Sequence, residues 1–243
     1  MYDPIEAIKF AIGTGMVGAS GYTIVNEIHR IIRDMHREKI ESCELTDWQI
    51  APGYNLVNGY KNPVIFDFKK TPHMLVSGLS QQGKSKMVEG ALKDKPVILV
   101  NTFRTDFTKL NNVIERVNDT KEIERIFEFL LNVKEGQNTT PLFIVIDELL
   151  SLVLSGDKNI MNLLTRLLAL GAHNNIYIVA ISQSSEKEII KNKNLFNIRV
   201  CFKMVEDSSY KVVLGYTPED NQLQPRQFHF YSDKVGTAVT YDV

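Results

Sequence analysis

The hydrophobic positions of the chain follow two alternating patterns: short apolar runs, and longer stretches in which apolar residues recur every three or four positions. The runs at residues 74–76, 97–100, 142–146, 176–181 and 198–204 predict strands. The periodic stretches at residues 121–133 and 160–170 predict helices, and a third helix is expected to follow residue 85 and to end before Pro96. Because strands alternate with helices, we expect an α/β fold with a central, mostly parallel sheet and helices on both faces.

The two ends of the chain differ from its middle. Residues 55–57 and 63–68, on either side of the turn-forming segment 58–62, predict a hairpin before the first buried strand. Two short strands, near residues 227–231 and 236–241, are expected to close the domain. Apolar residues along one side of residues 24–40 predict an amphipathic helix. We therefore divide the chain into an N-terminal helical segment, residues 1–45, and one α/β domain, residues 46–243.

An uncharged apolar run occupies residues 10–25 and is followed by basic residues. It is shorter than the roughly 20 residues that cross a membrane as a helix, but residues 7–26 approach that length if Lys9 extends its amine to the headgroups. Ala11, Gly15 and Ala19 have the spacing by which membrane helices approach each other. Two interpretations stay open: a membrane span at residues 7–26 with the α/β domain in the cytoplasm, or a glycine-rich segment packed on that domain.

Composition and charge narrow the class of protein. The chain has 243 residues, of which 44% are hydrophobic and 23% charged, and these are values of a globular protein with a packed core. A formal net charge of −1 excludes a protein that coats nucleic acid through bulk positive charge. Two distant cysteines, Cys43 and Cys201, exclude a disulfide framework and a cysteine-based zinc site.

The strongest chemical motif is GLSQQGKS at residues 78–85, directly after a predicted strand. It matches G-x-x-x-x-G-K-[ST], a P-loop, in which backbone N–H groups and the N-terminus of the next helix surround phosphate. In this pattern the lysine reaches the β- and γ-phosphates and the serine binds Mg²⁺. A plain strand–helix turn with a surface lysine is the alternative. We expect ATP to bind at Gly78, Leu79, Ser80, Gln81, Gln82, Gly83, Lys84, Ser85 and Met87.

A second motif is the acidic pair that ends the apolar strand 142–146. The carboxyl ends of parallel strands form the ligand-binding edge of an open α/β sheet. Asp147 is expected to complete the Mg²⁺ site with Ser85, and Glu148 to activate the attacking water as a general base. The alternative is that the two acids cap the N-terminus of the following helix.

Two further residues are candidates for the γ-phosphate end of the site. Gln183 follows the strand 176–181, which we expect to lie between the two motif strands, as in RecA-like, additional-strand P-loop ATPases; an exposed loop glutamine is the alternative. Hydrolysis also needs positive charge beyond the P-loop lysine, often an arginine from a neighbouring subunit. Arg199 is the preferred candidate, and a solvated surface arginine is the alternative. The other candidates are Arg166, Arg226 and Arg104.

Together these segments resemble those of the FtsK/SpoIIIE/HerA-type DNA-pumping ATPases. A Pro-His pair at residues 72–73 leads into the P-loop strand as in the family's PHLLVAG segment, and residues 145–149 match its VIDEL. Residues 167–183 resemble its A-x-G-x-H…A-T-Q segment, and residues 197–200 include an arginine that the family also places there. The chain departs from the family at residues 101–103, where the family has DPK, and at residues 184–185, where it has Arg-Pro.

The resemblance implies an ATP-hydrolysing motor that moves double-stranded DNA through a homo-oligomeric ring, usually a hexamer, with ATP between subunits. Small motors of this kind resemble those of mobile elements, in conjugative coupling or genome packaging, with a membrane, capsid or secretion partner. The excess of Lys and Arg within residues 187–211 is a candidate DNA-facing loop, with a solvated face as the alternative. The rival hypothesis is a nucleotide-gated, membrane-associated scaffold that binds ATP and oligomerises without moving DNA.

Overall fold

The computed structural model describes residues 44–57, 60–183 and 192–241. The chain divides into two units, residues 1–44 with 58–61 and residues 45–57 with 62–243. The sheet described below belongs to the second unit, apart from the first two residues of one strand. The apolar run at residues 10–25, the candidate span at residues 7–26 and the amphipathic helix predicted at residues 24–40 lie outside the described residues. Among the described residues, no helix combines the length and the apolar character that crossing a membrane requires.

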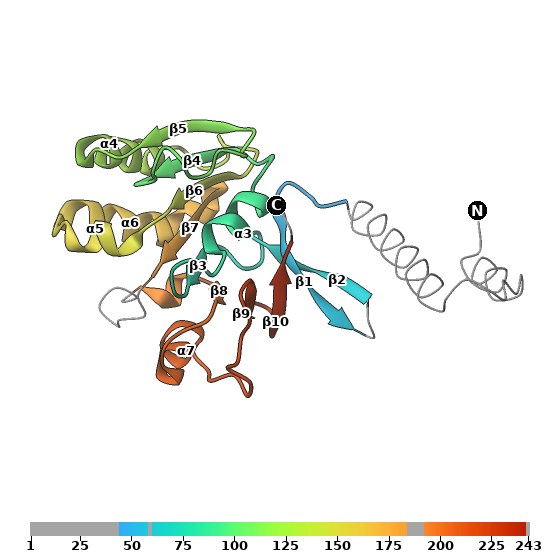
Figure 1. The fold of residues 1–243 in the computed structure, drawn as a ribbon. Helices are drawn as coiled ribbons and strands as arrows, with labels where there is room; N and C mark the ends of the chain where they lie inside the picture. The colour runs from blue at the N-terminus through green and yellow to red at the C-terminus, as the bar shows by residue number, and fades with distance from the viewer. Residues whose placement is uncertain (1–43, 58–59, 184–191, 242–243) are drawn as a thin grey trace, which may run out of the picture. The chain divides into compact units, whose positions relative to one another are not determined.

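Strands and helices alternate along most of the described chain (Figure 1). In order they are β1 (Gln49–Val57), β2 (Tyr60–Asp67), β3 (Met74–Ser77), α3 (Lys84–Ala91), β4 (Val97–Val100), β5 (Val113–Val117), α4 (Thr120–Leu131), β6 (Leu142–Ile146), α5 (Leu149–Leu154), α6 (Lys158–Leu170), the 3₁₀ turn η1 (Gly171–Asn174), β7 (Ile176–Ser182), the 3₁₀ turn η2 (Lys193–Leu195), β8 (Ile198–Cys201), α7 (Asp207–Leu214), β9 (Gln227–Tyr231) and β10 (Val235–Thr240).

These strands form one ten-stranded sheet with the order β2-β1-β10-β9-β8-β3-β7-β6-β4-β5. The segment from β8 to β5 is parallel throughout. From β8 to β1 the pairs are antiparallel, because β9 and β10 form a hairpin that joins the parallel part to β1. β7 lies between β3 and β6, the strands that lead into the two motifs. The expected α/β fold with an additional central strand is therefore confirmed.

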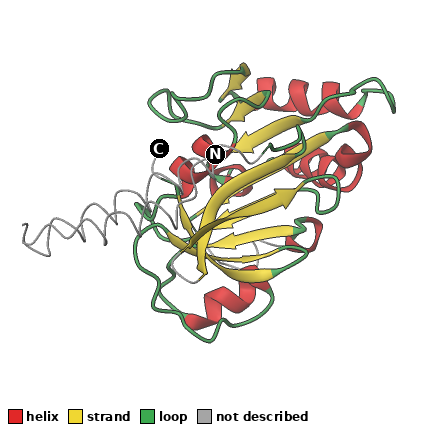
Figure 2. Ribbon diagram, turned by 90° about the vertical axis from the view of Figure 1, so that its right-hand side faces the viewer, coloured by secondary structure: helices red, strands yellow, loops and turns green. Residues whose placement is uncertain are grey.

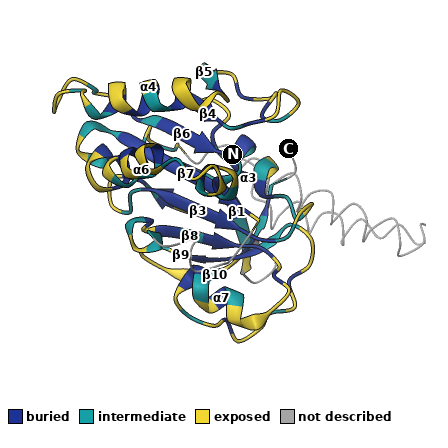
Figure 3. Cartoon of the chain, turned by 90° about the vertical axis from the view of Figure 1, so that its left-hand side faces the viewer, coloured by how far each residue is buried: buried dark blue, intermediate teal, exposed yellow. Residues whose placement is uncertain are grey.

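Side chains of the sheet enter two separate hydrophobic clusters, one on each face. Leu75 of β3 belongs to the cluster that contains the inner sides of α4, α5, α6 and α7. Its neighbours Met74 and Val76 belong to the other cluster, with Met87 and Val88 of α3 and residues of β1 and β2. Figure 2 shows helices beside the sheet, and in Figure 3 the central strands are buried while the outer sides of the helices are exposed. Burial on both faces explains why these strands are continuous apolar runs.

The predicted strands and helices are present with shifted ends, and three short elements lie outside the prediction: β5, α5 and α7. β5 is an edge strand with the sequence VIERV, in which Val113 and Ile114 are exposed, so it lacks the expected apolar run. α5 and α7 have only six and eight residues, too few for a helical period to stand out. The predicted hairpin begins too late, because β1 starts at Gln49, and the strand predicted at residues 198–204 ends at Cys201.

Candidate functional site

A cavity of about 1230 Å³ lies at the carboxyl edge of the sheet, where β3, β7 and β6 end. The loop between β3 and α3 contributes Ser80, Gln81 and Gly83, and the first turn of α3 contributes Lys84 and Ser85. The ends of β6 and β7 contribute three further predicted residues, Asp147, Glu148 and Gln183. The fold therefore brings the two sequence motifs to one cavity although more than sixty positions separate Lys84 from Asp147 along the chain.

Backbone geometry explains the glycines that bound the loop. Gly78 has φ +149°, and a Cβ at this position would lie 2.6 Å from the Cβ of Phe202. Gly83 has φ +103° in the left-handed region and is the N-cap of α3. Gln81 also adopts a positive φ, of 62°, which is uncommon for a residue with a side chain. The loop thus turns sharply and directs the unpaired N–H groups of the first turn of α3 toward the cavity, as an anion site requires.

Lys84 is held against its own loop. Its Nζ donates hydrogen bonds to the carbonyl oxygens of Gly78 and Leu79, each at 2.7 Å, and the residue is only 6% exposed. Burial lowers the pKa of Lys84, and the negative charges of Glu148 and Asp147 oppose this shift in part. An ammonium has three N–H donors, so one remains for a phosphate oxygen. The side chain is therefore positioned before any nucleotide arrives.

The predicted metal pair is in contact. Ser85 Oγ donates a hydrogen bond to Asp147 Oδ1 at 3.1 Å. Burial raises the pKa of Asp147; the Ser85 hydrogen bond lowers it, whereas the nearby carboxylates of Asp106 and Glu148 raise it further. A cation at this position would offset that accumulation of negative charge. Within the described residues no group of three or more His, Cys, Asp or Glu could hold a metal by itself. Two oxygen ligands fit Mg²⁺, which usually binds one or two protein groups together with water and phosphate.

Glu148 lines the cavity and also serves as a helix cap. One carboxylate oxygen accepts the Leu150 N–H at 3.2 Å, which makes Glu148 the N-cap of α5. Its backbone carbonyl lies 3.4 Å from the Asn101 side-chain nitrogen. The capping interpretation of this acid is thus realised in the structure, and the second carboxylate oxygen is left for a water molecule. The cap fixes the carboxylate at the cavity wall, so the cap and the predicted role as a base do not exclude each other.

Gln183 is oriented by the P-loop itself. Ser80 Oγ donates to Gln183 Oε1 at 2.5 Å, which joins the end of β7 to the middle of the loop. The amide nitrogen of Gln183 is the end of the side chain that this bond leaves for other contacts. The structure therefore places Gln183 where the sequence predicted it, at the tip of the strand between the two motif strands.

Five of the predicted residues are not among the described residues that line the cavity: Gly78, Leu79, Gln82, Met87 and Arg199. Met87 is 1% exposed and packs in the hydrophobic cluster below α3. Arg199 donates to the carbonyl oxygens of Phe196 and Leu214 at 3.1 and 3.0 Å, and its guanidinium lies 4.7 Å from the Tyr231 ring centroid. Arg199 therefore holds the end of α7 to β8 within its own chain.

The cavity contains residues to which the sequence analysis assigned no role. Thr240 and Tyr241 line one side, together with Arg226, which had been only a lesser candidate for the arginine. Asn101 and Asp106, from the loop after β4, line the opposite side. Asn101 and Arg226 both have positive φ values, 55° and 73°, a geometry that no sequence pattern announces. Only the course of the chain between distant elements brings these residues to the site.

The fold and the loop define the class: a P-loop nucleoside-triphosphatase fold of the additional-strand type. Sequence comparison supports the resemblance that the motifs indicate. The chain is 24% identical over 238 residues to the DNA translocase FtsK of Helicobacter pylori strain J99, a match that covers 80% of this chain and 28% of the relative. The chain thus spans little more than a quarter of that protein. Comparison with models of protein families finds no match.

Three solved structures illustrate the shared fold. The conjugation coupling protein TcpA of pCW3, with ATPγS, has a TM-score of 0.66 at 18% identity; the match covers 83% of this chain and 68% of TcpA. The cytoplasmic domain of the type VII secretion ATPase EccC of Thermomonospora curvata has a TM-score of 0.62 at 16% identity; the match covers 80% of this chain and 28% of EccC. The genome packaging NTPase B204 from Sulfolobus turreted icosahedral virus 2, with ATPγS, has a TM-score of 0.51 at 13% identity; the match covers 70% of this chain and 98% of B204.

Proposed function

We propose that this chain carries the motor domain of an ATP-driven translocase that moves double-stranded DNA as a ring oligomer. The observation that supports this most is the meeting of Lys84, Ser85, Asp147, Glu148 and Gln183 at one cavity. The similarity to FtsK supports DNA as the substrate, and the names of TcpA and B204 support a role in the transfer or packaging of a mobile-element genome. We place the domain in the cytoplasm, with membrane anchoring at residues 7–26 as a further proposal.

Different groups of this chain have different roles in ATP hydrolysis. The loop N–H groups and Lys84 bind the β- and γ-phosphates through charge-assisted hydrogen bonds. Ser85 and Asp147 would hold a Mg²⁺ ion, which would neutralise part of the phosphate charge. Glu148 accepts a proton from the attacking water on the carboxylate oxygen that does not cap α5. Gln183, oriented by Ser80, donates its amide N–H toward the γ-phosphate.

In a ring, a neighbouring subunit would supply a further cation at the γ-phosphate. Arg199 stays our proposal for the arginine offered to a neighbouring subunit, although it has to leave the Phe196 and Leu214 carbonyls to do so. Arg199→Lys tests it: lysine keeps the charge but not the planar fork. Because the internal bonds are weakened in either case, stability should fall somewhat under both hypotheses. The proposal predicts a loss of turnover per folded molecule, whereas a purely internal role predicts that turnover per folded molecule persists.

ATP hydrolysis measured with and without linear double-stranded DNA tests the function. We expect DNA to stimulate the wild type, Lys84→Ala to lose nucleotide binding, and Glu148→Gln to bind nucleotide without turning it over, because glutamine still caps α5. Lys121→Ala and Glu122→Gln, exposed on α4, are the matched controls and should behave as wild type. Displacement of a third strand from duplex DNA measures translocation directly.

The rival scaffold hypothesis makes a different prediction for the same experiments. A scaffold binds ATP tightly, turns it over slowly and ignores DNA, so hydrolysis that DNA does not change would overturn the motor proposal. Because the secretion ATPase EccC has the same fold, hydrolysis that responds to a polypeptide and not to DNA would also overturn it.

A further inference from the structure

The cavity extends beyond the groups that act on the phosphates. Its far side is a wall formed by the turn before β9 and the end of β10, and Pro225, Arg226, Thr240 and Tyr241 line it. The two ends of this hairpin lie side by side, because Val239 pairs with Gln227. We call these four lining residues the hairpin wall. The hydrolytic mechanism assigns no task to them.

The P-loop connects the two sides of the cavity and so fixes the direction of a bound triphosphate. Ser80 is bonded to Gln183 on the β7 side, whereas the carbonyl of Gln82 accepts the Arg226 backbone N–H at 3.2 Å on the β9 side. In the sheet, β7 and β6 lie on one side of β3, and β8, β9 and β10 on the other. The γ-phosphate has to face the acids at the end of β6. The nucleoside end therefore leaves the loop on the opposite side, toward the hairpin wall.

Arg226 is built to hold the hairpin wall together. From Nε it donates to the Thr240 hydroxyl at 3.1 Å, and from Nη2 to the carbonyls of Thr240, at 3.2 Å, and Tyr241. Three of its five N–H donors are thus engaged on the end of β10. Its backbone, at φ +73°, lies in the left-handed region, a strained conformation that persists only where the surroundings impose it. These contacts make Arg226 a positioning residue for Tyr241.

Tyr241 stands at the boundary between two cavities. It lines the nucleotide cavity and also a second cavity of about 550 Å³, whose wall includes Pro52, Met87 and Ala91. Its ring centroid lies 5.4 Å from that of Tyr54, at an interplanar angle of 45°. An aromatic face beside a partly apolar recess suits a flat heterocycle, since bases and tyrosine rings stack through their π faces.

We propose that Tyr241 binds the nucleotide base by stacking and that Arg226 positions it, so that the hairpin wall is the nucleoside subsite. The proposal rests on the proposed function, because it takes the triphosphate to lie on the P-loop. The proposal also predicts low selectivity among nucleotide bases, because any base can stack on a tyrosine ring.

Affinity for ATP and for inorganic tripolyphosphate, measured by calorimetry with Mg²⁺, separates the two halves of the site. We expect the wild type to bind ATP more tightly than tripolyphosphate. Tyr241→Ala should weaken ATP binding about 5- to 150-fold, the range of one lost stacking contact, and leave tripolyphosphate binding unchanged. Arg226→Ala should do the same to a smaller extent. Tyr241→Phe keeps the ring and should bind ATP as the wild type does.

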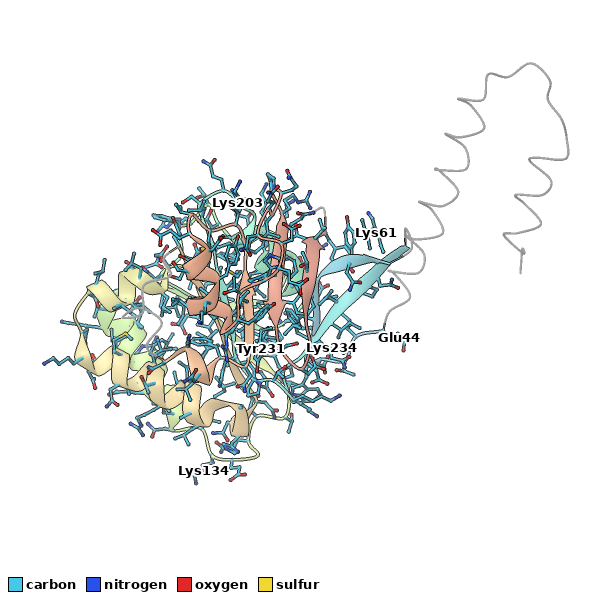
Figure 4. All side chains as sticks on the ribbon, turned by 90° about the horizontal axis from the view of Figure 1, so that it is seen from below. Glu44, Lys61, Lys134, Lys203, Tyr231 and Lys234 are labelled. Carbon is cyan, nitrogen blue, oxygen red and sulfur yellow. The ribbon has the colours of Figure 1, made fainter. Side chains whose placement is uncertain are left out.

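Lys234→Ala is the matched control, because it changes the same hairpin far from the cavity. Lys234 lies with Tyr231 at the turn of the β9–β10 hairpin, at the opposite end of the strands from Lys203, whose carbonyl accepts the N–H of Leu79 in the P-loop (Figure 4). If Tyr241→Ala or Arg226→Ala weakens both ligands equally, the wall acts on phosphate and the proposal is overturned. Equal wild-type affinity for the two ligands overturns it without any variant, so a misfolded variant leaves the proposal testable. Lys84→Ala should weaken both ligands; if it weakens neither, the proposed function fails instead.

Discussion

Acidification should destabilise the domain through one buried histidine, His73, which precedes β3. The residue is 1% exposed, and its Nδ1 accepts the Ile178 N–H at 3.0 Å, which joins the start of β3 to β7. Burial lowers the pKa of His73 from 6.5 to about 4, and a backbone contact with Leu168 opposes the shift in part. The folded chain therefore excludes a proton that the unfolded chain takes up below pH 6.5. Stability is complete above pH 6.5 and is lost as the pH falls toward 4.

The size of this effect follows from the two pKa values. Proton linkage gives a loss of about 2 kcal/mol by pH 5 and about 3 kcal/mol near pH 4. With a urea dependence of about 2 kcal/mol per molar, the unfolding midpoint should move by about 1 M between pH 7.5 and pH 5. Protonation also places a hydrogen on Nδ1, which then faces the Ile178 N–H instead of accepting from it.

Urea unfolding followed by circular dichroism at several pH values measures the loss. His73→Asn, which tolerates the observed φ of 62°, removes the titrating group. The variant should be less stable than the wild type at pH 7.5, and the difference should shrink by about 2 kcal/mol by pH 5, because only the wild type loses this contribution. His173→Asn, at an exposed histidine of η1, is the control. Parallel pH curves for wild type and His73→Asn would refute the reasoning.

Three further outcomes are expected. Gly78→Ala should lower the free energy of unfolding by at least about 3 kcal/mol, because the new Cβ clashes with Phe202 and the backbone has a positive φ. Gly136→Ala has the positive φ but meets nothing within 4 Å, so it should lower that free energy by about 1 kcal/mol. Thermal unfolding measures both losses. Gln183→Ala should lower ATP turnover and leave nucleotide affinity near the wild-type value, and an equal change in both would contradict the assigned role. Cys201 is buried and its pKa is raised by burial, so with the other cysteine changed to serine the native chain should resist thiol reagents at pH 8 and react only on unfolding.

Much of this fold could be read from the sequence, because a sheet buried on both faces leaves unbroken apolar runs. The same reasoning explains why the sequence did not predict β5 and α5. β5 lies at the edge of the sheet, and its residues change from exposed at Val113 and Ile114 to buried at Val117, so it carries little of the apolar signal on which strand prediction depends. The six residues of α5 begin at the acidic pair itself, where a helix start and a ligand-binding strand end have the same sequence signature.

The candidate site divides in a similar way. Local motifs located Lys84, Ser85, Asp147 and Glu148, because a phosphate loop and an acidic strand end have fixed spacing in sequence. The hairpin wall has no such signature, since it depends on tertiary packing of β9 and β10 against the loop. Arg226 illustrates the difference: sequence ranked it behind other arginines, and only its hydrogen bonds to β10 reveal what it does.

The strand that ends in the hairpin wall is also paired with the first strand of the domain. Gly53 and Tyr54 of β1 lie opposite Thr240 and Val239 of β10, and a Cβ on Gly53 would come within 2.3 Å of the Val239 carbonyl oxygen. The two backbones are therefore in direct contact, without an intervening side chain. Since β1 pairs directly with the strand that ends at the cavity, we expect a pulling force on β1 to reach the cavity, and ATP affinity to change with load in a single-molecule stretching experiment.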